Sequence, residues 1–286
     1  MESQSQAWTF NSLFLKDESL RQIRRQIYHS SGPGYVVIRE FFDQQQVEHA
    51  QEIWTSTSAS RHFEPFLGKH QFQLGSPNFM KKDDRGNRTF YNFLWGKPLD
   101  ELTYEATFYI QTLRNRISGR NSSNEILPIT GNSVSYRVVL TRNHEAPVPP
   151  HRDFWEPDHV LSKGHDLTRL QATLMLSEHG KDYAGRGFAL VNNQGKKVVF
   201  GVDEPVKAGD LIIWRYSNEH SVMDIRSSDQ QLGFLRILYP QEIIHDNSLG
   251  NRLLETLKTR GSPRYIASHL PIMWKKRIKR ALGVNR

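Results

Sequence analysis

The sequence predicts an α+β protein whose core is a double-stranded β-helix, or jelly roll, with flanking helices. Two observations lead to this prediction. Short apolar runs bounded by turn residues follow one another between residues 132 and 240. The segments before and after this stretch show helical spacing of their apolar residues. A long series of short strands joined by tight turns is typical of a sandwich, barrel or jelly roll.

These observations divide the chain into three regions. Residues 1–131 are expected to hold helices, a strand and a lid-like loop that pack on the core. Residues 132–240 are predicted to form the jelly-roll core, and residues 241–286 to form C-terminal helices with a basic tail. No internal repeat or low-complexity segment suggests another arrangement.

The N-terminal region combines strand and helix signals. Residues 34–39 form an apolar run after a turn that contains two glycines and a proline, which predicts a strand. Asp43 is a good N-cap, and the spacing that follows predicts a helix through Trp54. Helical spacing returns over residues 99–117. The intervening residues 63–95 are rich in Gly, Asn, Phe and charge, and we expect a long loop that covers an active site.

The second half of the chain supplies the core strands. The predicted strands are residues 134–141, 170–176, 187–191, 197–202, 210–216, 221–225 and 233–239. After Pro240 the pattern becomes helical again, over residues 251–260 and 271–282.

The composition excludes several classes of protein. The chain has 286 residues, of which 37% are hydrophobic and 24% charged, as in a folded globular protein. It has no cysteine, which excludes disulfides, a thiol nucleophile and cysteine-ligated metal sites. The apolar runs are shorter than a membrane span, and the first residues lack the features of a secretion signal. We therefore expect a cytoplasmic protein.

The net charge of +8 is concentrated at the C-terminal end. Residues 256–286 contain nine basic residues and no acidic one, which leaves 29 basic and 30 acidic residues in the rest of the chain. This neutral body argues against a nucleic-acid partner. Residues 271–286 predict a basic amphipathic helix with Trp274, which could bind peripherally to an anionic membrane surface. The alternative is a solvated helix docked by Trp274.

One histidine motif stands out as a candidate metal site. In an extended segment, His151 and Asp153 point to the same side and can reach one ion. An imidazole and a carboxylate are two of the three ligands in the facial triad that suits Fe(II). His220, between two predicted strands, is the best candidate for the third. The rivals are the loop histidines His159, His165 and His179. The alternative is a buried histidine hydrogen-bonded to an aspartate.

A buried arginine could anchor an organic cosubstrate. An oxygenase that uses 2-oxoglutarate needs a cation for the carboxylate remote from the metal, and the planar guanidinium suits this role. Arg236 lies in an otherwise apolar strand, whereas its rival Arg226 lies in a turn. Tyr136 and Thr141 are weak candidates for a second contact. The alternative for Arg236 is a structural salt bridge.

These motifs together resemble the iron(II)/2-oxoglutarate dioxygenase superfamily, in its prolyl-4-hydroxylase-like and phytanoyl-CoA dioxygenase-like branches. The chain departs from the prolyl-hydroxylase pattern at Arg186, where a second glycine is usual, and in the spacing of 16 residues between His220 and Arg236. The segments that carry the resemblance are His151–Asp153, Asp182–Phe188, Ala208–Trp214, His220–Val222, Gly233–Arg236 and, near the N-terminus, Gly34–Arg39.

The resemblance implies a metal centre of His151, Asp153 and His220, with Arg236 binding 2-oxoglutarate. The cofactors would be Fe(II), 2-oxoglutarate as cosubstrate and dioxygen, with ascorbate as a further candidate. The implied activity is hydroxylation of a small molecule, sugar or lipid-linked substrate, such as a glycolipid, with decarboxylation of 2-oxoglutarate to succinate. Two alternatives stay open. One is a non-catalytic, cupin-like binding domain, and the other is a hydroxylase of protein residues.

Overall fold

The computed structural model describes residues 8–9, 17–67, 76–119, 135–152 and 170–239. All of them belong to one unit, Met1–Glu242. The predictions for the C-terminal helices and the basic tail fall outside the described residues. No helix within the described ranges is both long enough and apolar enough to cross a membrane.

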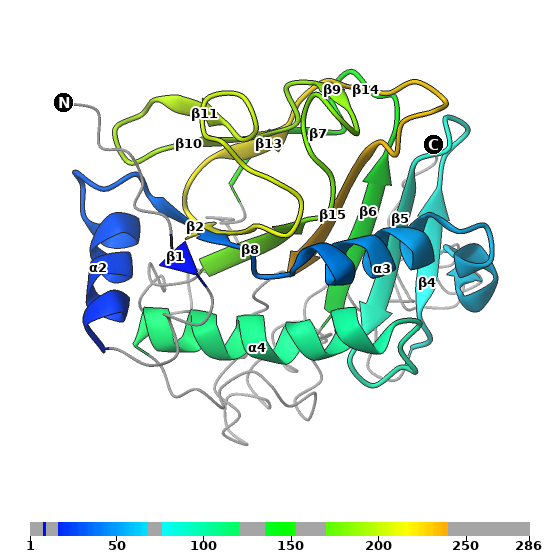
Figure 1. Cartoon of the computed structure of the whole chain (residues 1–286), viewed down its shortest axis with the longest axis horizontal. Helices are drawn as coiled ribbons and strands as arrows, with labels where there is room; N and C mark the ends of the chain where they lie inside the picture. Colours follow the sequence, from blue (N-terminus) through cyan, green and yellow to red (C-terminus); the bar gives the residue numbers. More distant parts are fainter. Residues whose placement is uncertain (1–7, 10–16, 68–75, 120–134, 153–169, 240–286) are drawn as a thin grey trace, which may run out of the picture. The chain divides into compact units, whose positions relative to one another are not determined.

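Two facing sheets form the core of this unit (Figure 1). The larger sheet has nine strands and the smaller has four, with a separate two-stranded ribbon beside them. In spatial order the larger sheet contains β1 (Trp8–Thr9), β2 (Tyr35–Arg39), β12 (Leu211–Arg215), β8 (Leu170–Met175), β15 (Phe234–Tyr239), β6 (Ser135–Thr141), β5 (Arg88–Phe93), β4 (Phe79–Lys82) and β3 (Glu64–Pro65). The smaller sheet contains β11 (Lys197–Val199), β10 (Phe188–Val191), β13 (His220–Val222) and β7 (Val148–His151), and the ribbon pairs β14 (Ile225–Arg226) with β9 (Ala184–Gly185).

The path of the chain confirms the predicted jelly roll. Strands β6, β8, β12 and β15 lie in the larger sheet, and the strands between them along the chain, β7, β10, β11 and β13, lie in the smaller sheet. This repeated crossing between two sheets is the topology of a double-stranded β-helix. The predicted strands agree with the observed ones to within a few residues, except that residues 221–225 divide between β13 and β14.

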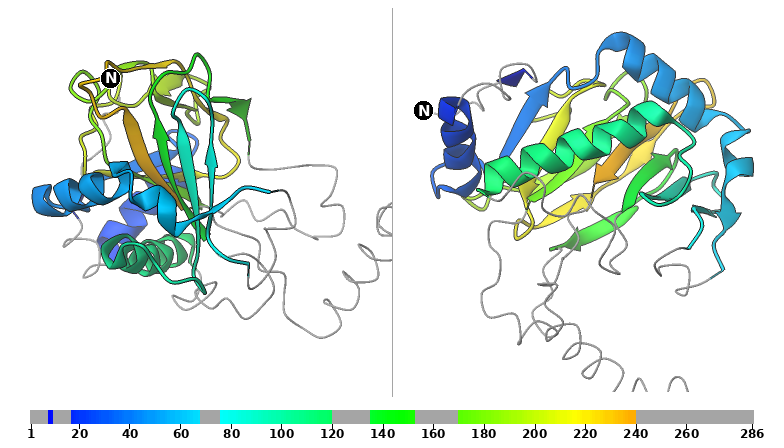
Figure 2. Two further views of the ribbon diagram at one scale, coloured as in Figure 1. Left: turned by 90° about the vertical axis from the view of Figure 1, so that its right-hand side faces the viewer. Right: turned by 90° about the horizontal axis from the view of Figure 1, so that it is seen from below.

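Helices cover the outer face of the larger sheet, so the fold is α+β as predicted (Figure 2). The helices are α2 (Asp17–Tyr28), α3 (Gln44–Thr55) and α4 (Glu101–Ser118), with a short 3₁₀ turn at Ala59–His62. Helix α2 is absent from the prediction, although its buried Leu20, Ile23 and Ile27 repeat at helical spacing.

Alternation along the strands creates two separate cores. On β8, Leu170, Ala172 and Leu174 pack toward the helices, whereas Met175 belongs to the cluster between the two sheets. Ile212 and Trp214 of β12 also face the space between the sheets. Because successive side chains of a strand point to opposite faces, only every second residue of a strand can reach a site between the sheets.

The predicted loop over residues 63–95 is wrong in part, because β4 and β5 extend the larger sheet there. The charged residues at the tip of this hairpin are typical of a loop, so the sequence pattern did not reveal the two aromatic-rich strands on either side. The rings of Phe79 and Tyr91 stack with centroids 4.5 Å apart. The Lys81 side chain contacts this cluster, because its Nζ lies 5.0 Å from the Tyr91 ring centroid. Its cation–π contact explains how a charged residue fits into an aromatic strand.

The turn into α3 is held by a capping box and by a close backbone contact. Asp43 accepts a hydrogen bond from the Gln46 backbone N–H, and the Gln46 side chain accepts one from the Asp43 N–H. The Phe42 N–H donates to the Gly209 carbonyl at 3.0 Å. Gly209 has a φ of +97°, and a Cβ there would lie 2.4 Å from the Phe42 carbonyl oxygen. The sequence therefore needs glycine at this contact between β12 and the start of α3.

Gly209→Ala is expected to destabilise the fold more than Gly195→Ala. Both glycines have positive φ, but a Cβ at Gly195 would meet no atom within 4 Å. Left-handed backbone alone costs alanine about 1–2 kcal/mol. The clash with Phe42 adds about 1–3 kcal/mol for Gly209→Ala. Urea unfolding of the two variants measures the difference, and equal losses would contradict the close contact.

Candidate metal centre

Two of the predicted metal ligands lie side by side between the two sheets. His151 is the last residue of β7 and His220 the first residue of β13, and the two are paired in register. Their ring centroids are 4.3 Å apart. His220 is 7% exposed and packs against Trp214, with ring centroids 5.5 Å apart. The predicted pairing of these two histidines is therefore present, although 69 positions separate them in the sequence.

Each of the two imidazoles is oriented by a backbone carbonyl two residues earlier in the chain. The Nδ1 of His151 donates to the Pro149 carbonyl at 2.9 Å, and the Nδ1 of His220 donates to the Asn218 carbonyl at 3.1 Å. Because a carbonyl can only accept, Nδ1 is the donor in both contacts, which leaves Nε2 as the atom through which a neutral imidazole would bind a metal. Backbone carbonyls commonly orient metal-binding histidines in this way. The two side chains fit an iron ion that binds through the Nε2 atoms.

The third predicted ligand, Asp153, lies outside the described residues. Within the described ranges, no group of three His, Cys, Asp or Glu side chains is arranged to hold a metal. Of the rival histidines, His159 and His165 also lie outside these ranges. His179 packs against Tyr183, with ring centroids 5.6 Å apart, and is not paired with His151. The structure thus separates His179 from the histidine pair.

Arg236 and its rival Arg226 occupy different environments. Arg236 is 6% exposed on β15, between β6 and β8. Its guanidinium carbon lies 5.6 Å from the ring centroid of Phe188, a residue between the sheets whose ring is 6.3 Å from that of His220. The Arg226 side chain is 74% exposed and pairs with Asp224 at 3.6 Å. Only the first of these two arginines shares the interior with the histidine pair.

The two weak candidates for a second cosubstrate contact face different ways. Tyr136 is fully buried beneath the helices and stacks on Tyr239, so it points away from the space between the sheets. Burial raises the pKa of the Tyr136 hydroxyl well above its ordinary value. Thr141 shares the inner face of β6 and pairs with Phe234 of β15. Because side chains alternate along a strand, Tyr136 cannot contact a cosubstrate between the sheets, whereas Thr141 lies on the face that can.

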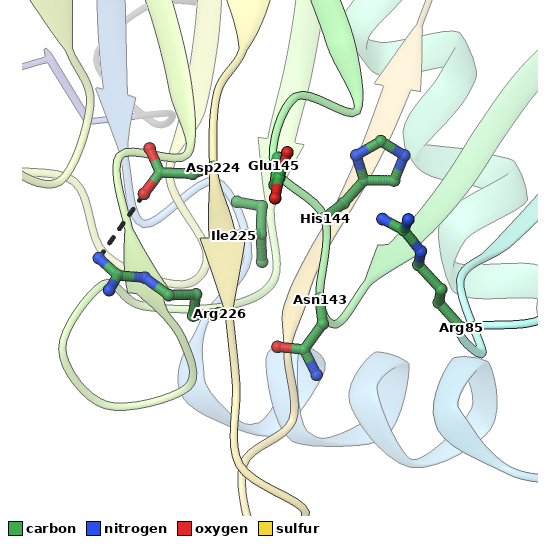
Figure 3. Close-up of a pocket in the computed structure, with 7 residues that line it drawn as sticks. All are labelled: Arg85, Asn143, His144, Glu145, Asp224, Ile225 and Arg226. Atoms are coloured by element: carbon green, nitrogen blue, oxygen red, sulfur yellow. Dashed lines mark ion pairs between the residues drawn. The ribbon is translucent and has the colours of Figure 1, made fainter.

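A separate hollow of about 640 Å³ lies at the opposite end of β7 and β13 (Figure 3). His144 and Ile225 exchange backbone hydrogen bonds of 3.0 and 2.8 Å there, whereas His151 and His220 pair at the other end of the same ladder. The hollow is therefore not the histidine site. Its lining residues are Arg85, Asn143, His144, Glu145, Asp224, Ile225 and Arg226.

Arg186, the departure from the prolyl-hydroxylase pattern, holds a carboxylate of this hollow. Its Nε donates to Asp224 at 2.6 Å, and Asp224 lies just before β14. This hydrogen bond lowers the pKa of Asp224 below its ordinary value. Arginine at this position thus links the turn after β9 to the segment before β14.

Arg186→Ala is expected to raise the pKa of Asp224 toward its ordinary value of about 3.9. A lowered carboxyl pKa contributes stability above the unfolded-state value, and this contribution is lost as pH falls through the folded-state value. The wild-type advantage over Arg186→Ala should thus be present above pH ~4 and vanish on acidification. Carboxyl-carbon NMR titration measures the shift. Arg226→Ala, which removes a contact of 3.6 Å, should raise the pKa less.

Comparison with known proteins finds similarity in structure and not in sequence. No family model matches the chain, and no curated protein does. Among solved structures, the non-heme α-ketoglutarate-dependent epimerase SnoN from nogalamycin biosynthesis is 15% identical with a TM-score of 0.47, covering 78% of this chain and 82% of that one. A Pseudomonas putida prolyl-4-hydroxylase is 16% identical with a TM-score of 0.45, covering 77% and 96%. A full-length Neurospora crassa protein in complex with α-ketoglutarate is 10% identical with a TM-score of 0.49, covering 83% and 86%.

Proposed function

We propose that this chain is an Fe(II)- and 2-oxoglutarate-dependent oxygenase that hydroxylates a small-molecule, sugar or lipid-linked substrate and converts 2-oxoglutarate to succinate. The observation that carries the proposal is the pair of inward-facing histidines, His151 and His220, inside a jelly roll whose interior also buries Arg236. Two imidazoles with their Nδ1 protons on backbone carbonyls are typical of metal ligands. A buried guanidinium in the same interior suits a carboxylate.

Each residue has a distinct role in this proposal. His151 and His220 bind the iron through Nε2, and Asp153 supplies the carboxylate that completes the facial triad. Arg236 binds the remote carboxylate of 2-oxoglutarate. When bound, iron and 2-oxoglutarate supply the oxidising chemistry, in which dioxygen and the cosubstrate yield succinate, carbon dioxide and the hydroxylated substrate.

The aromatic side chains around His220 keep water away from this centre. Trp214 and Phe188 are fully buried, and their ring centroids lie 4.9 Å apart. Phe188 lies against both proposed binding groups, with its ring centroid 6.3 Å from that of His220 and 5.6 Å from the Arg236 guanidinium carbon. Exclusion of water strengthens the interaction between a buried guanidinium and a carboxylate, because the local dielectric constant is lower than in water. The proposed reaction itself requires no protein general base.

Anaerobic titration of the metal-free protein with Fe(II) and 2-oxoglutarate tests the proposal. A weak visible charge-transfer band is expected when both are bound, followed by substrate-dependent succinate formation in air. A band without succinate under any substrate would favour the non-catalytic, cupin-like alternative. Absence of the band, with iron binding the same in His151→Ala and wild type, would refute the proposed centre.

A further inference from the structure

Two buried residues with polar side-chain atoms are paired in register next to the histidine pair. Gln171 of β8 pairs in register with Trp214 of β12. Because paired residues share one face of a sheet, the Gln171 side chain points between the sheets, as Trp214 does. Trp214 is fully buried and Gln171 is 3% exposed. The Trp214 ring contacts the ring of His220, so the Gln171–Trp214 pair borders the proposed metal centre.

Neither polar group is satisfied by the protein. Within the described part of the chain, Gln171 Oε1 and Trp214 Nε1 are buried and have no hydrogen-bond partner. Buried polar atoms are nearly always hydrogen-bonded, so an exception needs an explanation. Trp54 Nε1 is also without a partner, but the Trp54 ring lies in the core cluster beneath the helices, where it packs against Phe63 and Phe90. The distinguishing feature of Gln171 and Trp214 is their adjacency beside His220.

We propose that Gln171 and Trp214 bind the organic substrate through a hydroxyl group, an inference that rests on the proposed oxygenase function. The indole N–H needs an acceptor and the amide oxygen needs a donor, and one hydroxyl supplies both. A carboxylate offers acceptors only, so the pair does not suit either end of 2-oxoglutarate. A hydrocarbon substrate would leave both groups buried and unsatisfied. The pair therefore selects a hydroxylated substrate whose hydroxyl lies beside Trp214, the ring that packs on His220.

Stability of the ligand-free protein separates a binding role from a structural one. Gln171→Met keeps the shape of the side chain and removes an amide oxygen that makes no hydrogen bond. Its Tm is expected to equal that of the wild type or exceed it by up to about 3 °C. Thr173→Val is the matched control two residues away on the same face, because Thr173 Oγ1 donates to the Ile237 carbonyl at 3.1 Å. Loss of this bond should lower the Tm by about 2–4 °C.

Ligand binding tests the hydroxyl directly. The probes are cyclohexanol, which donates and accepts, and cyclohexanone, which only accepts. Saturation-transfer NMR with the metal-free protein should show cyclohexanol binding about three- to tenfold tighter than cyclohexanone. This preference should disappear in Gln171→Met and persist in Trp54→Phe. The anaerobic Fe(II) and 2-oxoglutarate band should be equally strong in Gln171→Met and wild type.

Three results would overturn the inference. The first is a Tm loss in Gln171→Met as large as in Thr173→Val, which would assign Gln171 a structural role, directly or through a bound water. The second is an unchanged probe preference in Gln171→Met. The third is a weaker charge-transfer band in that variant, which would assign the pair to the cosubstrate. Failure of the proposed function appears separately, as absence of the band in wild type, while the probe experiment needs no iron.

Discussion

His220→Ala is expected to abolish the Fe(II) and 2-oxoglutarate charge-transfer band and to reduce succinate formation below detection. The His220 imidazole is held by the Asn218 carbonyl and by ring contacts with Trp214 and Phe188, so its Nε2 is preorganised beside His151. Changes to groups that merely orient a ligand weaken metal binding by about 10- to 100-fold, and loss of the ligand itself should cost at least about 100-fold. Iron titration followed by the visible spectrum measures this loss.

His179→Ala is the matched control for this experiment. His179 also packs against a buried aromatic ring, that of Tyr183, but it lies away from the histidine pair. Its removal should leave iron affinity unchanged. Retention of the wild-type iron affinity in His220→Ala, with the fold intact by circular dichroism, would show that the histidine pair is structural.

Arg236→Met is expected to weaken 2-oxoglutarate binding by about 10- to 150-fold, because charge-assisted hydrogen bonds to a carboxylate contribute about 1.5–3 kcal/mol. Methionine retains much of the side-chain volume against Phe188 and Phe234, whose ring centroids lie 5.6 and 5.7 Å from the guanidinium carbon. Iron affinity without cosubstrate should be unchanged. Titration of the Fe(II)-loaded protein with 2-oxoglutarate under nitrogen measures the difference.

Arg226→Met serves as the control, since this exposed arginine was the rival candidate in the sequence and pairs only loosely with Asp224, at 3.6 Å. It should bind 2-oxoglutarate as the wild type does. If Arg226→Met weakened the cosubstrate more than Arg236→Met, the anchor would lie outside the interior and the proposed arrangement would be wrong.

The jelly-roll strands could be predicted because their apolar runs stand between clear turns. Strand β7 was not predicted, because Pro149 and Pro150 interrupt its pattern. Strands β4 and β5 were also missed, because the charged residues at their hairpin tip are typical of a loop. The contacts of Lys81 with Phe66 and Tyr91 lie between segments of the chain, and local sequence carries no signal of them.

Part of the site could also be predicted from local sequence motifs. His151 and His220 could be proposed from an H-x-D motif and a junction between strands, and their pairing is present. Tyr136, a weak candidate for a cosubstrate contact, faces the helices instead, because tertiary packing decides which face of β6 lies against them. Gln171 was overlooked, although a glutamine inside the apolar run of β8 is a detectable signal. Its unsatisfied amide is apparent only when Trp214 is seen beside it.

The position of β7 has a consequence for solubility. It is the last of the four described strands of the smaller sheet and pairs only with β13 among them. An open edge can recruit a strand from a second molecule and start aggregation, and proline blocks this because it has no N–H to donate. Pro149 and Pro150 are exposed on β7. Pro149 and Pro150, which interrupt the strand pattern in the sequence, thus protect this edge from intermolecular pairing. The same edge carries His151.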